Sequence, residues 1–220
     1  MRITPKPKKS WTIWRKNNET YFQFHLSQLD KRKKLVDLGA GNCEFAKLFK
    51  KFNYTGIDFH PYPGVIVQDI TKGIQWENDS VDIITMSNTL EHLPNPQFIL
   101  EECNRILNSG GIIVGAVPFL VGEHQQPYDF FRYTRFQLEI MLNQAGFKEI
   151  SISPLGNLWD VHQDLLRAIS WEIRKTEINK TLKFRIWRKS QNVMLAFARK
   201  YFGNIQPKSF IMGFGFKGTK

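Results

Sequence analysis

The sequence predicts an α/β fold: a doubly wound, mostly parallel seven-stranded sheet with a helical insertion before its last strand. Apolar runs recur through residues 35–117, and segments with helical spacing of apolar side chains lie between them. Strands that alternate with helices in this way form a parallel sheet with helices on both faces. A turn rich in glycine follows the first apolar run, where such folds bring the backbone close to a bound ligand.

The first strand is predicted at residues 35–38, which are apolar except for Asp37. Residues 39–41, with the sequence Gly-Ala-Gly, follow directly. Apolar side chains then recur with helical spacing over residues 45–49. This order indicates a strand, a tight turn and a helix.

The composition of the turn predicts which cofactor binds there. A dinucleotide fold places a third glycine three residues after Gly41, so that a pyrophosphate can sit on the helix N-terminus. Glu44 occupies that position and repels a pyrophosphate, whereas Asp37 stands where it can meet a cation. S-adenosylmethionine (SAM) carries an ammonium and a sulfonium group and no phosphate. We therefore expect SAM as the cofactor, held by Asp37, Gly39, Ala40 and Gly41.

The second strand supplies the next candidate for cofactor binding. Residues 54–58 form a short apolar run that ends in Asp58, nineteen residues beyond Gly39. An acid at this distance from a glycine turn accepts hydrogen bonds from ribose hydroxyls. Phe59 follows, and it either stacks on the adenine or fills the core.

The third and fourth strands end in further candidates. Asp69 closes the third strand, beside Ile70, and we expect it to accept from the adenine amino group; the alternative is an acid that only forms a turn. The fourth strand spans residues 81–87, so Ser87 and the nearby Leu90 are expected to line the cofactor pocket.

The remaining elements follow from periodicity and from glycine, proline and capping signals. In order, we expect a helix over residues 99–107, a turn at Gly110 and Gly111, a strand over residues 112–117, a helix from Thr134 (a capping box with Gln137) to Gly146, and strands over residues 147–153 and 210–216.

Four motifs give the chain a resemblance to a known family. They are Val-Asp-Leu-Gly-Ala-Gly at residues 36–41, Gly-Ile-Asp at 56–58, Leu-Glu-His-Leu-Pro at 90–94, and Arg-Ile-Leu at 105–107 followed by Gly-Gly at 110–111. In this order and spacing they resemble the class I SAM-dependent methyltransferases. The resemblance covers roughly residues 35–155 and implies the fold and the cofactor. It does not identify the methyl acceptor.

Composition and cysteine content bound the class of protein. The chain has 220 residues, of which 42% are hydrophobic and 23% charged, as is ordinary for one globular domain with an elaboration. We expect no signal peptide and no membrane-spanning helix, because no apolar stretch is long enough. Two cysteines without metal-ligand spacing indicate a reduced compartment. We therefore predict a cytoplasmic protein, with peripheral attachment to the inner face of the membrane as a further expectation.

The net charge of +11 is concentrated in two segments. Residues 1–34 hold ten Lys and Arg against two acids, residues 157–203 hold ten against four, and the rest of the chain is slightly acidic. Tryptophan mixed with cations suggests contact with an anionic surface, for which we favour a membrane over nucleic acid. The alternative is that the charges are simply solvated. Five of the six tryptophans lie in these segments: Trp11, Trp14, Trp159, Trp171 and Trp187.

These segments also set the predicted domain boundaries. Residues 1–34 form a basic N-terminal segment with a helix, and residues 35–156 with 205–220 form the main domain. Residues 157–204 form an insertion of two amphipathic helices. We expect the apolar faces of these helices to pack on the main domain, with contact to lipid as the alternative.

The loop after the fifth strand contains the candidates for catalysis. Residues 123–134 are too polar and aromatic for a plain connector, and they resemble the acceptor-side loop of many bacterial methyltransferases. His124 is the first candidate for a general base, since imidazole titrates near neutral pH; the alternative is a histidine that only fixes the loop. Asp129 and Tyr128 are the other candidates, although Asp129 is also placed to pair with Arg132.

Two further expectations concern histidine. His92 follows the fourth strand beside Glu91, and the family resemblance implies a role in shaping the cofactor pocket rather than in proton transfer. His25, His60 and His162 have no carboxylate at ligand spacing. The sequence therefore predicts no metal site.

Taken as a methyltransferase, the chain is expected to act on a small-molecule or lipid-linked acceptor, with a saccharide of envelope glycan biosynthesis as the leading choice. One alternative is an RNA methyltransferase, which the charge suits, although no RNA-binding module is recognisable. The other is a partner subunit that binds SAM without catalysis, because binding does not prove turnover.

Overall fold

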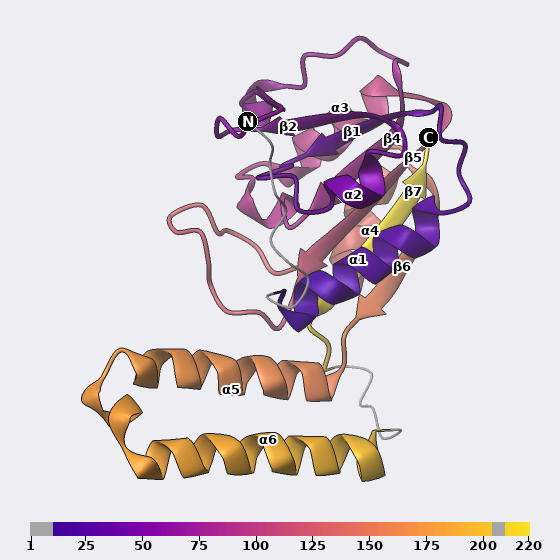
Figure 1. Ribbon diagram of the computed structural model, residues 1–220. Helices are drawn as coiled ribbons and strands as arrows, with labels where there is room; N and C mark the ends of the chain where they lie inside the picture. Colours follow the sequence, from indigo (N-terminus) through magenta and orange to yellow (C-terminus); the bar gives the residue numbers. More distant parts are fainter. Residues whose placement is uncertain (1–10, 204–209) are drawn as a thin grey trace.

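The computed structural model of the protein describes residues 11–203 and 210–220 (Figure 1). Its centre is one seven-stranded sheet with the strand order β3-β2-β1-β4-β5-β7-β6. All neighbouring strands are parallel except β7, which is antiparallel to both β5 and β6. The predicted α/β fold, with its helical insertion before the last strand, is confirmed.

The bounds of the strands and helices are as follows. The strands are β1 (Lys34–Leu38), β2 (Asn53–Asp58), β3 (Val65–Val67), β4 (Val81–Ser87), β5 (Leu107–Pro118), β6 (Lys148–Leu155) and β7 (Gly213–Thr219). The α-helices are α1 (Ile13–Leu26), α2 (Ala46–Phe49), α3 (Pro96–Ile106), α4 (Arg135–Gln144), α5 (Leu158–Arg174) and α6 (Leu182–Phe202); short 3-10 turns include η2 (Ile70–Lys72), η3 (Leu90–His92) and η4 (Glu177–Lys180).

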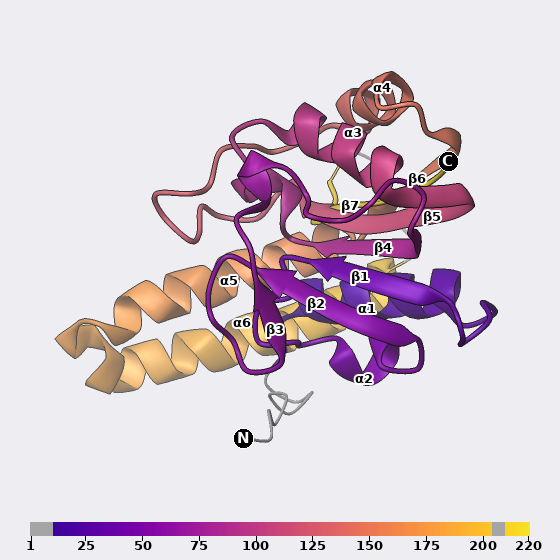
Figure 2. The same ribbon diagram turned by 90° about the horizontal axis from the view of Figure 1, so that it is seen from above.

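Helices cover both faces of the sheet. Side chains of α3 and α4 form one apolar cluster with the strands, and side chains of α1 and α2 form the other. Figure 2 shows the two helix layers on opposite sides of the sheet. This arrangement leaves the carboxyl ends of β1, β2, β4 and β5 free for the loops that carry function.

The close packing of α1 on β7 depends on glycine. A Cβ atom at Gly215 would come within 2.6 Å of the Tyr21 ring, and one at Gly213 within 2.4 Å of the Trp14 ring. The alternating Phe214 and Phe216 face the other core cluster. One face of β7 is therefore flat so that an aromatic helix can lie against it.

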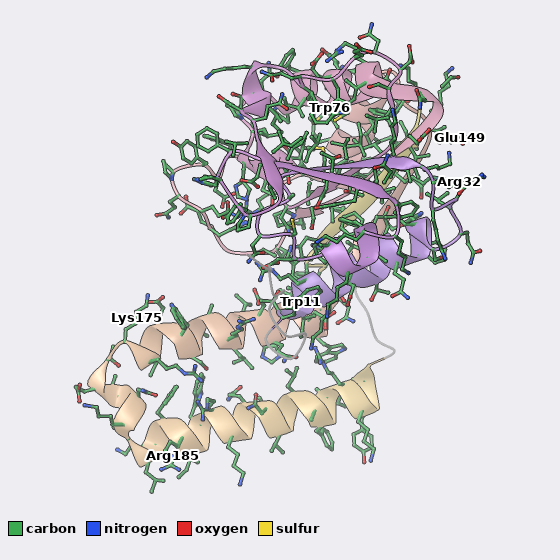
Figure 3. All side chains as sticks on the ribbon, turned by 45° about the horizontal axis from the view of Figure 1, so that its top comes forward. Trp11, Arg32, Trp76, Glu149, Lys175 and Arg185 are labelled. Atoms are coloured by element: carbon green, nitrogen blue, oxygen red, sulfur yellow. The ribbon has the colours of Figure 1, made fainter. Side chains whose placement is uncertain are left out.

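The structure corrects the expectation that the N-terminal tryptophans face an anionic surface. Trp11 and Trp14 are both buried in the apolar cluster of α1, and Figure 3 shows Trp11 at the junction between the sheet domain and the inserted helices. Arg15 of the same helix forms an ion pair of 2.8 Å with Glu44 beside the glycine turn. The helix is thus part of the sheet domain, whereas residues 1–10 of the predicted basic segment lie outside the described residues.

Two predicted strands begin at other residues in the structure. The fifth strand begins at Leu107 rather than after Gly110 and Gly111, and its pairing with β4 shifts register near its start. The last strand begins three residues later than predicted, because Gly213, Gly215 and Gly218 weaken its strand signal.

The insertion forms a hairpin of two helices, α5 and α6, that extends away from the sheet (Figure 1). Asn157 begins α5 through a reciprocal capping box with Asp160. Asp160 also accepts from Arg199 near the end of α6 at 2.8 Å, which fastens the hairpin at its base. Lys175 and Arg185 lie at the far end of the hairpin (Figure 3). The predicted boundary at residues 204 and 205 lies outside the described residues.

The expectation that the apolar faces of the hairpin pack on the main domain is wrong for most of their side chains. Phe184 and Leu195 are buried, and Val161 joins the α1 cluster. Leu158, Leu166 and Ile173 are half-buried. The following side chains are exposed, because the hairpin leaves the sheet almost at once: Leu165, Ile169, Trp171, Ile178, Leu182, Ile186, Val193, Met194, Phe197, Tyr201 and Phe202. Within residues 11–203 and 210–220, no helix is both long enough and apolar enough to span a bilayer.

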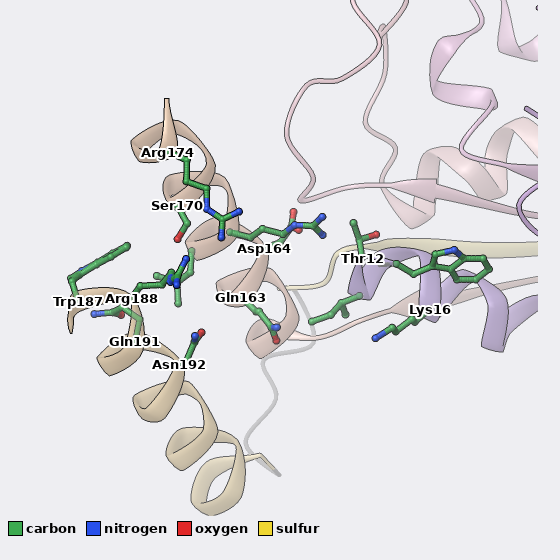
Figure 4. A pocket seen from close by; sticks show the side chains of 14 residues that line it. Thr12, Lys16, Gln163, Asp164, Ser170, Arg174, Trp187, Arg188, Gln191 and Asn192 are labelled. Atoms are coloured by element: carbon green, nitrogen blue, oxygen red, sulfur yellow. The ribbon is translucent and has the colours of Figure 1, made fainter. Parts of the chain in front are cut away.

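A cavity of about 360 Å³ lies between the two helices of the hairpin and the start of α1 (Figure 4). Lys16, Arg174 and Arg188 line it together with Asp164. Burial raises the pKa of Asp164, and the nearby Arg167 partly opposes that effect. The inner side of the hairpin therefore combines charged side chains with apolar ones such as Leu166 and Trp187.

We expect α1 to contribute to the stability of the whole domain. Phe22 is fully buried and Phe24, two residues away on the same helix, is 76% exposed. Phe22→Ala should lower the free energy of unfolding by about 3–5 kcal/mol, because it opens a cavity in the core. Phe24→Ala should change it by less than about 0.5 kcal/mol. Urea unfolding followed by circular dichroism measures both, and equal effects would contradict this assignment of α1.

Candidate functional site

The glycine turn after β1 has the geometry of a cradle. Gly39 and Gly41 adopt positive φ angles of +73° and +52°. The N–H groups of Gly39 and Ala40 both donate to the Ile57 carbonyl at 2.9 Å, which ties the turn to β2. A Cβ atom at Gly41 would meet nothing within 4 Å, so the backbone there borders open space. Such a position accommodates the close approach of a bound molecule.

Asp58 lies beside this turn. One carboxylate oxygen accepts from the N–H of Gly41 at 2.8 Å and the other from the N–H of His60 at 2.9 Å. A carboxylate offers about four lone-pair directions, so both oxygens keep capacity for hydroxyl donors. Phe59 follows with 60% of its surface exposed, and is therefore free to cover a ring rather than filling the core.

Asp37 is enclosed beneath the turn. Its oxygens accept from Thr85 Oγ1 at 2.8 Å and from the Tyr54 hydroxyl at 3.2 Å. Burial raises the pKa of this carboxyl to about 7, against the effect of these two hydrogen bonds. A cationic group beside the turn would favour the charged carboxylate again.

The other predicted cofactor residues lie at the same edge of the sheet in different environments. Asp69 accepts from the N–H and hydroxyl of Thr71 and pairs with Lys72 at 3.0 Å, which are the contacts of a turn-forming acid. The side chains of Ile70 and Leu90 are buried in the core, so only their backbone borders the site. Ser87 ends β4 and is half-buried.

One contact at this edge had no signal in the sequence. Trp14 Nε1 of α1 donates to Asn88 Oδ1 at 2.6 Å, directly after β4. Asn88 has a positive φ of +53°, an unusual conformation that this hydrogen bond and its backbone bond to Ala116 hold in place. The two residues are 74 positions apart, and each alone is an ordinary surface or core residue.

The loop after β5 is organised by Arg132. Its guanidinium donates to both oxygens of Asp129, at 2.7 and 2.8 Å, and to the carbonyls of Val121 and Gly122. The pairing of Asp129 with Arg132 considered from the sequence is thus present. Arg132 is the main reason that the pKa of Asp129 lies far below its usual range. Asp129 also accepts from the N–H of His124 at 2.8 Å, so this ion pair fixes the start of the loop.

The loop carries His124 to the 3-10 turn that follows β4. The ring centroids of His92 and His124 are 4.8 Å apart in a T-shaped arrangement. Glu91 Oε1 lies 3.7 Å from His92 Nε2 and 3.9 Å from His124 Nε2. His92 Nδ1 forms a short hydrogen bond to the Tyr128 carbonyl, while the Tyr128 side chain itself is exposed.

Glu91 is fully buried at the centre of this group. Neither of its carboxylate oxygens accepts a hydrogen bond from another described residue. Burial raises the pKa of Glu91 to about 8, and the Arg132 guanidinium opposes this only in part. The sequence did not indicate the cluster, because His124 is 32 residues from His92 and only the folded loop brings them together.

Comparisons with known proteins agree with this architecture. A family model described as a methyltransferase domain matches residues 13–152. The chain is 26% identical over 172 residues to an uncharacterized protein of Methanocaldococcus jannaschii, covering 68% of this chain and 83% of that protein. It is 31% identical over 94 residues to an uncharacterized methyltransferase of Mycobacterium tuberculosis, covering 36% of this chain but only 37% of that protein. A SAM-dependent methyltransferase from Archaeoglobus fulgidus has the same fold, with a TM-score of 0.62, 15% identity and 94% of each chain covered.

The chain belongs to the methyltransferase-domain family. It is a SAM-dependent methyltransferase, and SAM is its cosubstrate. The open space over Gly41 and the acceptor capacity of Asp58 fit a molecule with an adenosyl group. The loop after β5 stands over the carboxyl ends of the strands, the edge at which folds of this kind bind ligands.

The two glycines of the turn should differ in their tolerance of alanine. Both have positive φ, which costs a residue with a side chain roughly 1–2 kcal/mol. At Gly39 the new Cβ would in addition come within 2.2 Å of Thr89 Oγ1, which already donates to the Leu38 carbonyl. Gly39→Ala should therefore lower the free energy of unfolding by about 1–3 kcal/mol more than Gly41→Ala. Chemical unfolding of both variants tests this, and equal losses would refute it.

Proposed function

We propose that the protein transfers the methyl group of SAM to a small-molecule or lipid-linked acceptor, with a saccharide of envelope glycan biosynthesis as the leading choice. The observation that carries the proposal is that the hairpin of α5 and α6 has both exposed apolar side chains and a net positive charge. The hairpin extends to the same side of the sheet as the loop after β5 (Figures 1 and 2).

The cofactor-binding side of the proposal rests on the edge formed by β1, β2 and β4. Asp58 accepts hydrogen bonds from the ribose hydroxyls, and Phe59 covers the adenine. The backbone of residues 39–41 borders the methionine part of SAM. When bound, SAM supplies a methyl carbon that is already activated by the sulfonium. The protein then has to position the acceptor and exclude water.

The acceptor side of the proposal rests on the loop after β5. His124 is one-third exposed and faces the space beside Glu91, so it is available to a substrate. Its assignment as a general base remains a prediction. Asp129 acts by holding Arg132 and the backbone of His124, and the exposed Tyr128 is placed to contact the acceptor.

An apolar cavity supports a lipid-linked acceptor. It measures about 600 Å³ and lies between the start of this loop and the start of α5. Leu120 and Val121 line it from the loop, and Trp159, Val161 and Leu165 line it from the helix. An isoprenoid or acyl chain has the chemistry to fill such a space, while its head group reaches the polar loop that follows.

The exposed faces of the hairpin support contact with an anionic membrane. On α6, Ile186, Val193 and Phe197 are exposed along one side of the helix. Residues 157–203 carry ten Lys and Arg against four acids. An interfacial helix needs both an apolar face to enter the lipid and cations to meet anionic head groups.

The cofactor assignment predicts a specific loss on mutation of Asp58. Asp58→Ala should weaken the binding of S-adenosylhomocysteine by roughly 1.5–3 kcal/mol, the scale of charge-assisted hydrogen bonds. Asp58→Asn, which keeps one acceptor oxygen, should lose less. Asp79→Ala serves as control, since Asp79 pairs with Lys220 before β4 begins. Calorimetry measures all three, and unchanged binding by Asp58→Ala would remove Asp58 from the site.

The membrane assignment predicts a loss of vesicle binding when the hairpin becomes polar. The double variant with Ile186→Ser and Phe197→Ser should no longer float with phosphatidylcholine vesicles that contain phosphatidylglycerol. It should also transfer less labelled methyl group from SAM into the organic-extractable fraction of membranes. The matched control replaces Ile140 and Phe136 of α4 by Ser, which are 49% and 61% exposed against 60% and 55% in the hairpin.

Two outcomes would contradict this assignment. Equal flotation of both double variants would show that the hairpin does not enter lipid. A protein that ignores vesicles but binds RNA, with an affinity that falls steeply as salt rises, would favour the RNA methyltransferase instead. Binding to vesicles through an apolar face should weaken only in part with salt.

A further inference from the structure

The polar atoms of Glu91, His92 and His124 lie close together although no hydrogen bond joins the three side chains. Each imidazole is anchored through Nδ1 on a backbone carbonyl: His92 on Tyr128, and His124 on Gly122 at 3.1 Å. A carbonyl only accepts, so both Nδ1 atoms carry the proton and both Nε2 atoms present a lone pair.

These lone pairs are directed at a carboxylate. His92 Nε2 is buried without a hydrogen-bond partner among the described residues, as are both oxygens of Glu91. Glu91 Oε1 thus faces the Nε2 atoms of His92 and His124 with no donor between them, and the separations of 3.7 and 3.9 Å are too long for hydrogen bonds. Either a proton or a metal ion would satisfy acceptors arranged in this way.

We propose that Glu91, His92 and His124 form a binding site for a divalent transition-metal cation, with zinc as its first candidate. Two imidazoles and one carboxylate are a ligand set that zinc enzymes use, with a remaining position open to substrate. The anchoring of each Nδ1–H on a carbonyl is the outer contact that orients ligating histidines.

The distances agree with this assignment. One ligand atom from each residue lies within 4.8 Å of the others. Bonds of about 2.0–2.1 Å to a tetrahedral zinc place ligand atoms roughly 3.4 Å apart. Small rotations of the three side chains would close the present separations to that value.

The surrounding charges also permit a cation. Arg132 is close to His124, with Nη2 at 3.5 Å from Nδ1, but its guanidinium is already neutralised by both oxygens of Asp129. Both N–H groups of Arg132 Nη2 already donate, one to the Gly122 carbonyl and one to Asp129, so neither is left to donate to His124 Nδ1. Arg132 therefore leaves the carboxyl group of Glu91 available to a cation.

A cation at this site would favour acceptors that bind it through a hydroxyl oxygen. Glu91 is enclosed, whereas His124 is one-third exposed, so the open position of the cation faces the substrate side. A hydroxyl oxygen bound there would lose its proton to water more readily, its electron pair staying on oxygen for attack on the methyl carbon. This use of the site rests on the proposed function and makes His124 a ligand rather than a base. The binding of the cation itself is independent of it.

Titration of the chelator-treated full chain with zinc tests the proposal. Calorimetry should show one equivalent of Zn²⁺, and Co²⁺ in its place should give a visible absorption band of a site with nitrogen and oxygen ligands. His92→Ala, His124→Ala and Glu91→Gln should each weaken Zn²⁺ binding by at least about tenfold, since even loss of an outer contact has effects of that size. His60→Ala is the matched control, because His60 is exposed and outside the cluster.

The outcomes separate this proposal from the proposed function. Zn²⁺ affinity that is absent, or equal in the wild type and the three variants, overturns the metal site and leaves a proton as the occupant of the cluster. Normal binding of S-adenosylhomocysteine in the variants shows that they are folded, and Glu91→Gln preserves shape if an alanine variant fails that test. Zinc binding that depends on the cluster, without any methyl transfer to hydroxyl acceptors, would retain the site and overturn both its role in activating a hydroxyl and the choice of a saccharide as acceptor.

Discussion

The packing of Trp14 is the interaction on which the rest of the structure depends. Its ring fills the space over Gly213 of β7, and its Nε1 donates to Asn88 at the end of β4. One side chain thereby joins the first helix to the last strand and to the edge where substrates meet. The neighbouring Arg15 adds the ion pair with Glu44 beside the glycine turn. The residues at the carboxyl ends of β1 and β4 are consequently held in place by α1 as well as by the strands themselves.

Elements whose signal is local were predictable from the sequence. The glycine turn, Asp58 and the bounds of β4 follow from spacing and strand pattern within a few residues, and the structure has them where the pattern indicates. The contacts of α1 were not predictable in this way. The sequence suggested a surface position for Trp14, because the flat glycine face against which it packs lies some 200 residues later in the chain.

The cluster around Glu91 shows the same limit at the candidate site. His92 and His124 were each noticed, but nothing in the sequence indicated that the two side chains meet. They meet because Arg132 binds two carbonyls and both oxygens of Asp129, which folds the loop back onto η3.

The hairpin is a different case. Periodicity identified its apolar faces but not what covers them, since a stripe of apolar side chains has the same period whether it meets protein or lipid.

The place of β7 in the sheet has a consequence for how the chain folds. This strand lies between β5 and β6, yet it follows both of them and the whole hairpin in the sequence. Until it inserts, β6 has no partner, and the fully buried Phe216 is missing from the core of α3 and α4. The edge of β5 and the strand β6 must therefore stay unpaired while residues 156–212 are synthesised. Pairing between strands that are so far apart in the sequence is slow. Completion of the sheet and docking of α1 on its glycine face thus become a single late event, which couples the two ends of the polypeptide in time as well as in space.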